Sequence, residues 1–367
     1  MALADPVQEA ARLMRICNAC RYCEGHCAVF PAMELRVAFP ERDLRYLANL
    51  CHGCGACFHH CQYAPPHEFG VNVPRVFDEL RRDTWARHAW PRFLAPLLAR
   101  SGGASLAAAG VSAVALAAAG ALLAGPSALR PHAGAGAFYE VVPHDVLVAV
   151  FGAAFLWAGL AMAMAYRSFR REAGDPGEAV PAAAHRRAAA DSATLRYLDG
   201  GGGGCTYPGE RPSAARRRWH HVVFYGFLLC FAATCTAAVL DALGHRAPHP
   251  WWSAPVLLGS TGGAGLVAGS IGLLVLRARS DAAPFPRAGM DAAFLALLLL
   301  TAVTGFLVLF FRATAAMGVL LLVHLGVVLG LFVTLPYGKF VHALYRYAAL
   351  ARWAVERARP PPAAPPE

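Results

Sequence analysis

The sequence predicts an all-α protein in which a small, cysteine-rich helical domain precedes a bundle of six membrane-spanning helices. Of its 367 residues, 57% are hydrophobic and only 15% are charged, which is too little polar surface for a soluble protein of this size. Beyond residue 100 the chain divides into six apolar runs that contain no Asp, Glu, Lys or Arg. Eight of the eleven cysteines fall in two short runs before residue 62.

The charge pattern limits which classes of partner we expect for this protein. The formal net charge is +10, but no arginine-rich stripe is interleaved with aromatic residues, so we exclude nucleic acid as a partner. The opening stretch MALADPVQEAARLMRIC lacks the basic start and apolar centre of a signal peptide. We therefore expect the cysteines to begin in a reducing cytoplasm, where clustering of this kind favours metal ligation over disulfides.

The two cysteine runs repeat one pattern. CNACRYCEGHC at residues 17–27 and CHGCGACFHHC at residues 51–61 both read C-x2-C-x2-C-x3-C. In two-cluster ferredoxins, three thiolates of such a run bind one [4Fe–4S] cluster and the fourth binds the other. The pattern predicts two clusters with crossed ligand sets. The first would take Cys17, Cys20, Cys23 and Cys61, and the second would take Cys51, Cys54, Cys57 and Cys27.

The alternatives to iron–sulfur clusters are zinc and disulfides. Structural zinc sites usually combine two distant C-x2-C pairs, and three cysteines at successive three-residue steps overfill that geometry. Between the runs, Leu, Val and Tyr recur at helical spacing, which favours a helical ferredoxin domain over the small β-rich type. We expect the nearby histidines to lie at the surface or to donate hydrogen bonds near cluster sulfurs.

Each of the six apolar runs is close to the ~20 residues that cross a bilayer, although the first is poor in large side chains and could lie on the membrane surface instead. Basic residues gather in 166–221, in 277–291 and after Tyr337, whereas the opposite loops hold only Arg130, Arg246 and Arg312. By the positive-inside rule, we expect a multi-pass protein of the cytoplasmic membrane with both termini in the cytoplasm. The runs are 104–125, 146–166, 222–240, 254–276, 292–311 and 315–335.

Four histidines are candidate haem ligands. His324 lies deep in an apolar run, and His342 follows eighteen positions later, which is five helical turns if the helix continues past Pro336. His220 and His221 open the third run. Since this run and the sixth are antiparallel, one of these two would face His342 and form a bis-histidine haem b site. His324 could hold a second haem with His144 or His245, or line a quinone or proton route.

These features predict five segments. The Pro- and Gly-rich stretches suggest disorder in part of the linker and in the tail. We interpret the five glycines at 200–204 as a flexible hinge. The alternative is that they let the backbone approach a cofactor or partner closely. The segments are a two-cluster ferredoxin-like domain (1–95), a first transmembrane hairpin (100–166), a cytoplasmic linker (167–219), a four-helix haem-binding domain (220–350) and a Pro-rich tail (351–367).

Several motifs carry a family resemblance. The paired cysteine runs are followed by LRYLDGGGGGCTYP, RRWHHVVFYGFLLCFAAT, GMD and HLGVVLGLFVTLPYGKFVHALYR, and this order resembles the tricarballylate/citrate-utilisation protein B family over nearly the whole chain. The last run is also similar to the haem-b subunit of respiratory nitrate reductase, whose eighteen-residue histidine step implies that His324 and His342 are both ligands. Ten residues after His220 and His221, however, stand Cys230 and Phe231 rather than histidine.

The resemblance implies an electron-transfer component with no catalytic residues for an organic substrate. It would reoxidise an FAD-dependent tricarballylate or citrate-like acid dehydrogenase at the cytoplasmic face and reduce the membrane quinone. A reduced flavin yields two electrons, whereas clusters and haems carry one each, so a relay is required. One alternative is electron transfer with a different flavoprotein, such as a cobalamin-pathway oxygenase. The others are a redox sensor and a membrane oxidoreductase with its own substrate site. The last lacks support because no Rossmann fingerprint is present.

Overall fold

The computed structural model describes residues 5–96, 102–125, 130–132, 134–174, 179–284 and 289–359. Within these ranges all named elements are helices, and the only β pairing is an isolated bridge between Cys205 and Ser213. The all-α fold class is therefore confirmed.

Five helices form the N-terminal domain. The first of them starts where the side chain of Asp5 accepts hydrogen bonds from the Val7 and Gln8 amides and where Pro6 supplies a preset φ. The core includes Phe30, Tyr46 and other large side chains that are buried between the helices. The helices are α1 (Pro6–Cys20), α2 (Val29–Glu34), α3 (Glu41–Leu50), α4 (Ala56–His59) and α5 (Val73–His88).

Among the described residues beyond the N-terminal domain, six helices are long and apolar enough to cross a membrane, as predicted. In α9, only 11% of the most apolar 18-residue segment is buried within the protein. Most of the apolar surface of this helix therefore faces outward, as a lipid-exposed helix requires. The six spans are built from α7 (Gly102–Ala124), α9 (His144–Ala173), α11 (Ala215–Ala242), α12 (Ala254–Ala278), α13 (Gly289–Phe311) and α14 (Met317–Thr334) with its continuation α15 (Val341–Glu356).

The sixth span is not one continuous helix. We predicted that His324 and His342 could share a face if the helix ran past Pro336, but α14 ends at Thr334 and a 3-10 turn covers Leu335–Tyr337. Pro336 has no amide hydrogen for a helical bond, and Gly338 is extended with φ −112° and ψ −164°. The prediction that helical periodicity places the two imidazoles on one helix face is therefore wrong.

Small residues bring the spans close together. A Cβ built on Gly262 of α12 would lie 2.7 Å from the Gly226 carbonyl oxygen of α11, and one built on Gly326 of α14 would lie 2.1 Å from Cα of Ala113 in α7. Such contacts let backbones approach closely, which favours helix association in lipid. Because α7 packs directly on α14, it is part of the bundle rather than a separate helix on the membrane surface.

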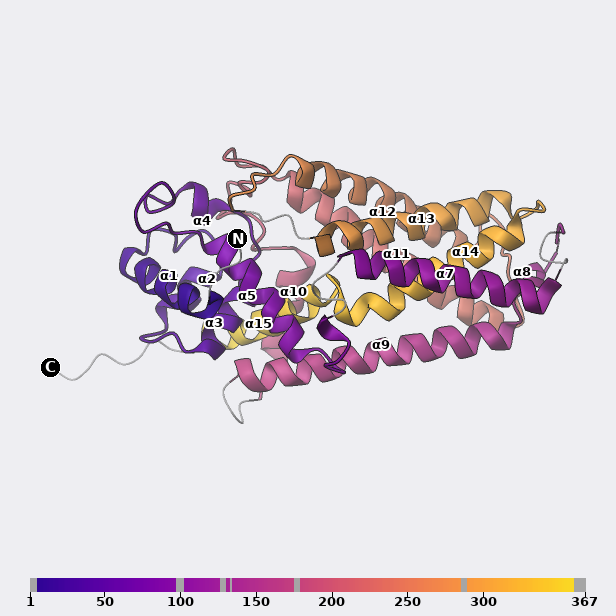
Figure 1. The fold of residues 1–367 in the computed structure, drawn as a ribbon, viewed down its shortest axis with the longest axis horizontal. Coiled ribbons are helices and arrows are strands. Elements are labelled where there is room, and N and C mark those ends of the chain that lie inside the picture. The colour runs from indigo at the N-terminus through magenta and orange to yellow at the C-terminus, as the bar shows by residue number, and fades with distance from the viewer. Residues whose placement is uncertain are drawn as a thin grey trace.

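Figure 1 shows α1–α5 gathered at one end of the bundle together with α10 (Ala182–Ala193) and α15, whereas α8 (Ala137–Val141) lies at the other end. The N-terminal domain shares its core with this end of the bundle, since Phe169 of α9 and Tyr345 of α15 are buried in the same cluster as Phe77. The domain is thus packed on the bundle rather than tethered to it.

Parts of the predicted linker and tail are helical. In the linker, α10 packs against α15, and in the tail α15 continues to Glu356 with Ala351 and Trp353 buried. Residues 175–178 of the linker and residues 360–367 of the tail lie outside the described ranges.

Candidate functional site

The first cysteine run begins on the last turn of α1. Cys17 and Cys20 are three residues apart and so share a helix face, and the helix ends because Arg21 takes the left-handed conformation (φ 55°) with its amide bonded to the Cys17 carbonyl. The chain then reverses through turns that carry Cys23 toward the same side. Local helix termination therefore gathers three thiols of this run.

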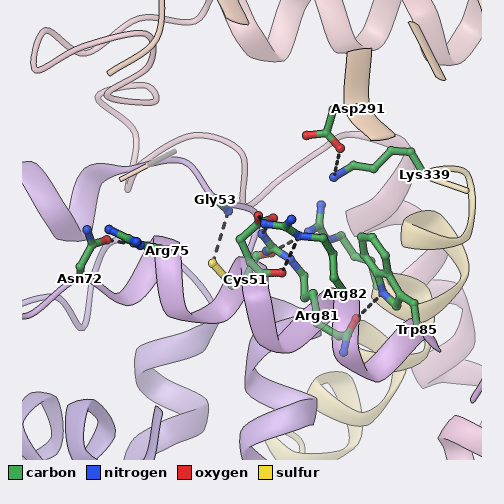
Figure 2. Close-up of polar contacts among 12 residues, drawn as sticks. Cys51, Gly53, Asn72, Arg75, Arg81, Arg82, Trp85, Asp291 and Lys339 are labelled. Carbon is green, nitrogen blue, oxygen red and sulfur yellow. Dashed lines mark hydrogen bonds and ion pairs between the residues drawn. The ribbon is translucent and has the colours of Figure 1, made fainter. Parts of the chain in front are cut away.

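The second run begins at the end of α3. Cys51 caps that helix, and Gly53 (φ 61°) and Gly55 (φ 84°) turn the chain before α4 places Cys57. Only glycine adopts such angles without strain. The amide of Gly53 also points at Sγ of Cys51, 3.3 Å away (Figure 2). Hydrogen bonds of this type tune the potential of an iron–sulfur centre.

The thiols divide between two cavities. A cavity of about 260 Å³ is lined by the four cysteines predicted for the first cluster, with Cys57 also at its wall. Burial and the neighbouring thiols raise the pKa of Cys17 and of Cys23 to about 12. Thiols with such a raised pKa become thiolates when a metal replaces their protons. The four are Cys17, Cys20, Cys23 and Cys61.

A second, smaller cavity is lined by the four cysteines predicted for the second cluster. Burial and the nearby thiols raise the pKa of Cys27 and of Cys57 well above the ordinary value. The fourth cysteine of each run thus lies with the first three of the other run, which is the crossed arrangement of two-cluster ferredoxins. The four are Cys27, Cys51, Cys54 and Cys57.

Across the part of the chain that the structure describes, no three His, Cys, Asp or Glu side chains converge closely enough to hold one metal ion. The eight thiols surround two volumes instead. A donor set of thiols around a volume fits a polynuclear cluster better than the single zinc ion that we weighed as an alternative.

The glycine run at 200–204 packs on this domain. A Cβ on Gly201 (φ 83°) would lie 2.7 Å from the Gly25 carbonyl oxygen, and one on Gly200 would lie 3.6 Å from Cβ of Ala56. After the run, Cys205 is fully buried and the Thr206 hydroxyl lies 3.5 Å from the Cys54 carbonyl oxygen. The segment therefore packs closely on the N-terminal domain of its own chain, and its close approach to a cofactor or partner stays a prediction.

Two imidazoles meet at the end of the bundle nearest the cysteines. The rings of His220 on α11 and His342 on α15 have centroids 6.0 Å apart and an interplanar angle of 75°. Nδ1 of His342 lies 2.6 Å from the Lys339 carbonyl oxygen. Because a carbonyl can only accept, Nδ1 carries the proton and Nε2 is free to bind a metal, a hydrogen-bonding arrangement found in most histidine ligands.

The surroundings of this pair are partly apolar and leave one imidazole nitrogen without a partner in the described part of the chain. An imidazole nitrogen binds a transition metal at ~2 Å, so two rings with centroids 6.0 Å apart can share one iron. Nδ1 of His220 is buried and has no hydrogen-bond partner among the described residues. Deeper in the bundle, the phenyl rings of Phe227 and Phe340 lie 5.4 Å apart and supply an apolar wall.

The other two histidine candidates lie elsewhere. His221 packs on Tyr225 of its own helix, with ring centroids 5.9 Å apart, so His220 is the residue that faces His342. His324 is in the bundle interior, where its Nδ1 lies 3.0 Å from the Thr304 hydroxyl of α13. The structure thus brings His324 to a hydroxyl, and His144, proposed as its partner, pairs with Asp241 at 2.7 Å.

Sequence reasoning missed two arginines that hold the cysteine loop, one from the N-terminal domain itself and one from the bundle. Arg81 of α5 donates to the Cys51 carbonyl at 2.7 Å, and Arg216 of α11 donates to the Gly53 carbonyl. Arg346 of α15 donates to the same Cys51 carbonyl at 2.6 Å. No sequence pattern marks these contacts, because each arginine alone resembles a solvated charge.

A half-buried ion-pair network lies at this junction. Figure 2 shows Arg81 beside the Cys51–Gly53 loop and Lys339 directed at Asp291. Asp291 pairs with Lys339 at 2.8 Å and with Arg277 at 3.1 Å. These contacts anchor the segment between α14 and α15, whose Lys339 carbonyl orients His342.

Two family models match the chain. Citrate utilization protein B matches residues 98–363, and the Citrate utilization protein B Fer4-like domain matches residues 10–87. The chain is also 47% identical over 366 residues to Citrate utilization protein B of Escherichia coli, an alignment that covers 97% of this chain and 94% of that protein. No solved structure matches the chain.

Proposed function

The chain belongs to the citrate utilization protein B family, and on this premise we propose that it transfers electrons from a reduced flavoprotein to the membrane quinone pool. The flavoprotein would be an FAD-dependent dehydrogenase of tricarballylate or a citrate-like acid. The observation that carries the proposal is the division of eight cysteines between two cavities, one of which adjoins a facing histidine pair.

The chemistry requires carriers that accept one electron at a time, which [4Fe–4S] clusters and haem iron supply when bound. Cys17, Cys20, Cys23 and Cys61 would hold the first cluster, and Cys27, Cys51, Cys54 and Cys57 the second. The first set is partly exposed, and Tyr22 at its rim is 69% exposed. Cys51 and Cys54 of the second set are buried. The first set is therefore the entry side and the second the side that adjoins the membrane bundle.

His220 and His342 would hold haem b, because their rings face each other and the Lys339 carbonyl fixes the tautomer of His342. Arg346 links the two sites, because it lies one turn after His342 on α15 and donates a hydrogen bond to the Cys51 carbonyl. His324, bonded to Thr304, stays a candidate second ligand or a polar residue of the quinone route.

The proposed orientation places the cysteine domain in the cytoplasm. The α1–α5 end of the bundle carries the arginine-rich segments, and positive charge favours the cytoplasmic side. A flavoprotein partner and its organic acid would meet the protein there. The quinone would be reduced within the bundle, in the cytoplasmic membrane.

The test uses the full chain, purified anaerobically in detergent. Reduced flavoprotein should reduce two [4Fe–4S] centres, seen by electron paramagnetic resonance, and one b-type haem, seen by its α-band, and a soluble quinone should reoxidise all three within turnover time. In a His342→Ala variant the clusters should still be reduced but should not be reoxidised at the native rate. Absence of iron and acid-labile sulfide from the native chain, or cycling that does not depend on the flavoprotein, would sink the proposal.

A further inference from the structure

Each histidine of the facing pair has an arginine one helical turn away on its own helix. Arg216 precedes His220 by four residues on α11, and Arg346 follows His342 by four residues on α15. Residues four apart share a helix face. Because α11 and α15 run in opposite directions here, both arginines lie on the side of the imidazoles that adjoins the N-terminal domain, as their contacts to Gly53 and Cys51 require.

These two guanidinium groups have no carboxylate partner among the described residues. Arg216 donates to the Gly53 carbonyl and lies 4.4 Å from the ring centroid of Tyr207. Arg346 donates to the Cys51 carbonyl, and its Nε is buried without a hydrogen-bond partner. The neighbouring arginines are different: Arg81 pairs with Asp78 at 3.1 Å and Arg217 pairs with Asp199 at 3.3 Å.

Two half-buried cations at the head of a membrane bundle need a compensating anion, since an unpaired charge away from water is costly. Neutral carbonyl groups satisfy some N–H donors, and the thiols of Cys51 and Cys54 lie near the two groups, but neither guanidinium is paired with a planar oxyanion among the described residues. Guanidinium groups prefer planar oxyanions, which they bind through two parallel hydrogen bonds. The local chemistry therefore favours a pair of carboxylates.

We propose that Arg216 and Arg346 form the binding site for the two propionate carboxylates of haem b. The inference rests on the proposed function, which places that haem between His220 and His342. Haem is amphipathic, with both carboxylates on one edge of an otherwise apolar ring. The structure has the matching polarity: the arginines lie on one side of the imidazole pair, and Phe227 and Phe340 lie on the other.

The test compares haem with its dimethyl ester, which has the same iron and ring but no carboxylates. The full chain would be produced in haem-starved cells and titrated with each porphyrin, with binding followed by the Soret band. The native chain should bind haem at least about tenfold more tightly than the ester, as expected for charge-assisted hydrogen bonds. In an Arg216→Met/Arg346→Met double variant, the two porphyrins should bind equally.

Arg217→Met is the matched control, because this neighbour on α11 pairs with Asp199 rather than facing the histidines, and it should keep the native preference. Equal binding of haem and ester by the native chain would overturn the inference, and this measurement does not depend on whether any variant folds. The inference also fails if the double variant keeps the preference and changes only the potential of a cluster. A native chain that binds neither porphyrin would instead refute the proposed haem site itself.

Discussion

The carbonyl oxygen of Lys339 lies 2.6 Å from Nδ1 of His342, and the ammonium group of the same lysine pairs with Asp291. One residue thus connects a half-buried ion pair to the imidazole that we propose as a haem ligand. The helix break at Pro336 makes this possible, since the carbonyl of Lys339 stands just before α15 and is not used in α14.

Asp291→Asn should therefore destabilise the bundle and weaken haem retention together. The substitution leaves Lys339 and Arg277 without their carboxylate, and we expect a loss of about 2–3 kcal/mol of unfolding free energy. Chemical unfolding in detergent and the b-type absorbance would measure the two effects. Asp145→Asn, at a fully exposed position of α9, is the control and should leave both unchanged. If the Asp291 variant is destabilised but keeps its full haem content, the Asp291–Lys339 ion pair does not control haem binding at His342.

The histidine pair can be tested by substitution. His220→Ala and His342→Ala should each abolish the b-type absorbance, because each removes one of two facing imidazoles. His221→Ala should retain it, since His221 packs on Tyr225 instead. A pyridine haemochrome count decides the result. Loss of haem in the His221 variant with retention in the His220 variant would reverse the assignment.

The crossed cysteine sets predict separable cluster losses. Cys17→Ala should remove the first cluster and Cys51→Ala the second, so each variant should keep about half of the native iron. The remaining paramagnetic signal should differ between the two variants. Cys230→Ala, in α11 and away from both cavities, serves as the control. If the two cysteine variants lost the same signal, the ligand sets would need to be redrawn.

The α11–α12 contact predicts a sharp size limit. Gly262→Leu should destabilise the bundle by about 1–3 kcal/mol, because the space beside Gly262 is filled by the Gly226 carbonyl and by Cys230. Gly259→Ala lies on the same helix, where an added Cβ would meet Ala233 at an ordinary 3.6 Å. Thermal unfolding in detergent should distinguish them, and equal midpoints would contradict the close packing of these helices.

His88 predicts a pH dependence. Burial, with the positive charges of Arg87 and Arg45, lowers its pKa to about 4 and outweighs Glu172, whose carboxylate is 3.2 Å away. The unfolded chain protonates near pH 6.5, so the stabilisation is complete above that pH and is lost as the pH falls toward 4. Between pH 7 and pH 5 the unfolding free energy should fall by about 2 kcal/mol.

His88→Gln removes this titration, so the difference in stability between the native chain and the variant should change over the same pH interval. Unfolding curves at pH 7 and pH 5 for both chains give that difference directly. A native chain whose advantage is constant over the interval would mean that folding does not shift the pKa of His88, and an advantage that grows toward pH 5 would mean that His88 is charged in the folded state.

The sequence predicted what depends on local spacing and on transmembrane hydropathy. The cysteine steps indicated which thiols gather, because helix ends and glycine turns act over a few residues. The antiparallel order of spans indicated that one of two adjacent histidines would face His342. The relation of His324 to His342 was wrong because one proline changes the helical phase. The roles of Arg81 and Arg216 could not be read, because they arise only when distant segments pack.

The packing of Gly200 and Gly201 on the cysteine loops bears on how the molecule matures. These glycines follow the first two spans in the chain, whereas Cys27 and Cys54 precede both spans. The contacts of these glycines with Gly25 and Ala56 form only after the first hairpin and the segment before α11 have been synthesised. If these thiols bind a metal cluster, it could therefore be inserted before the glycine segment packs over the loops.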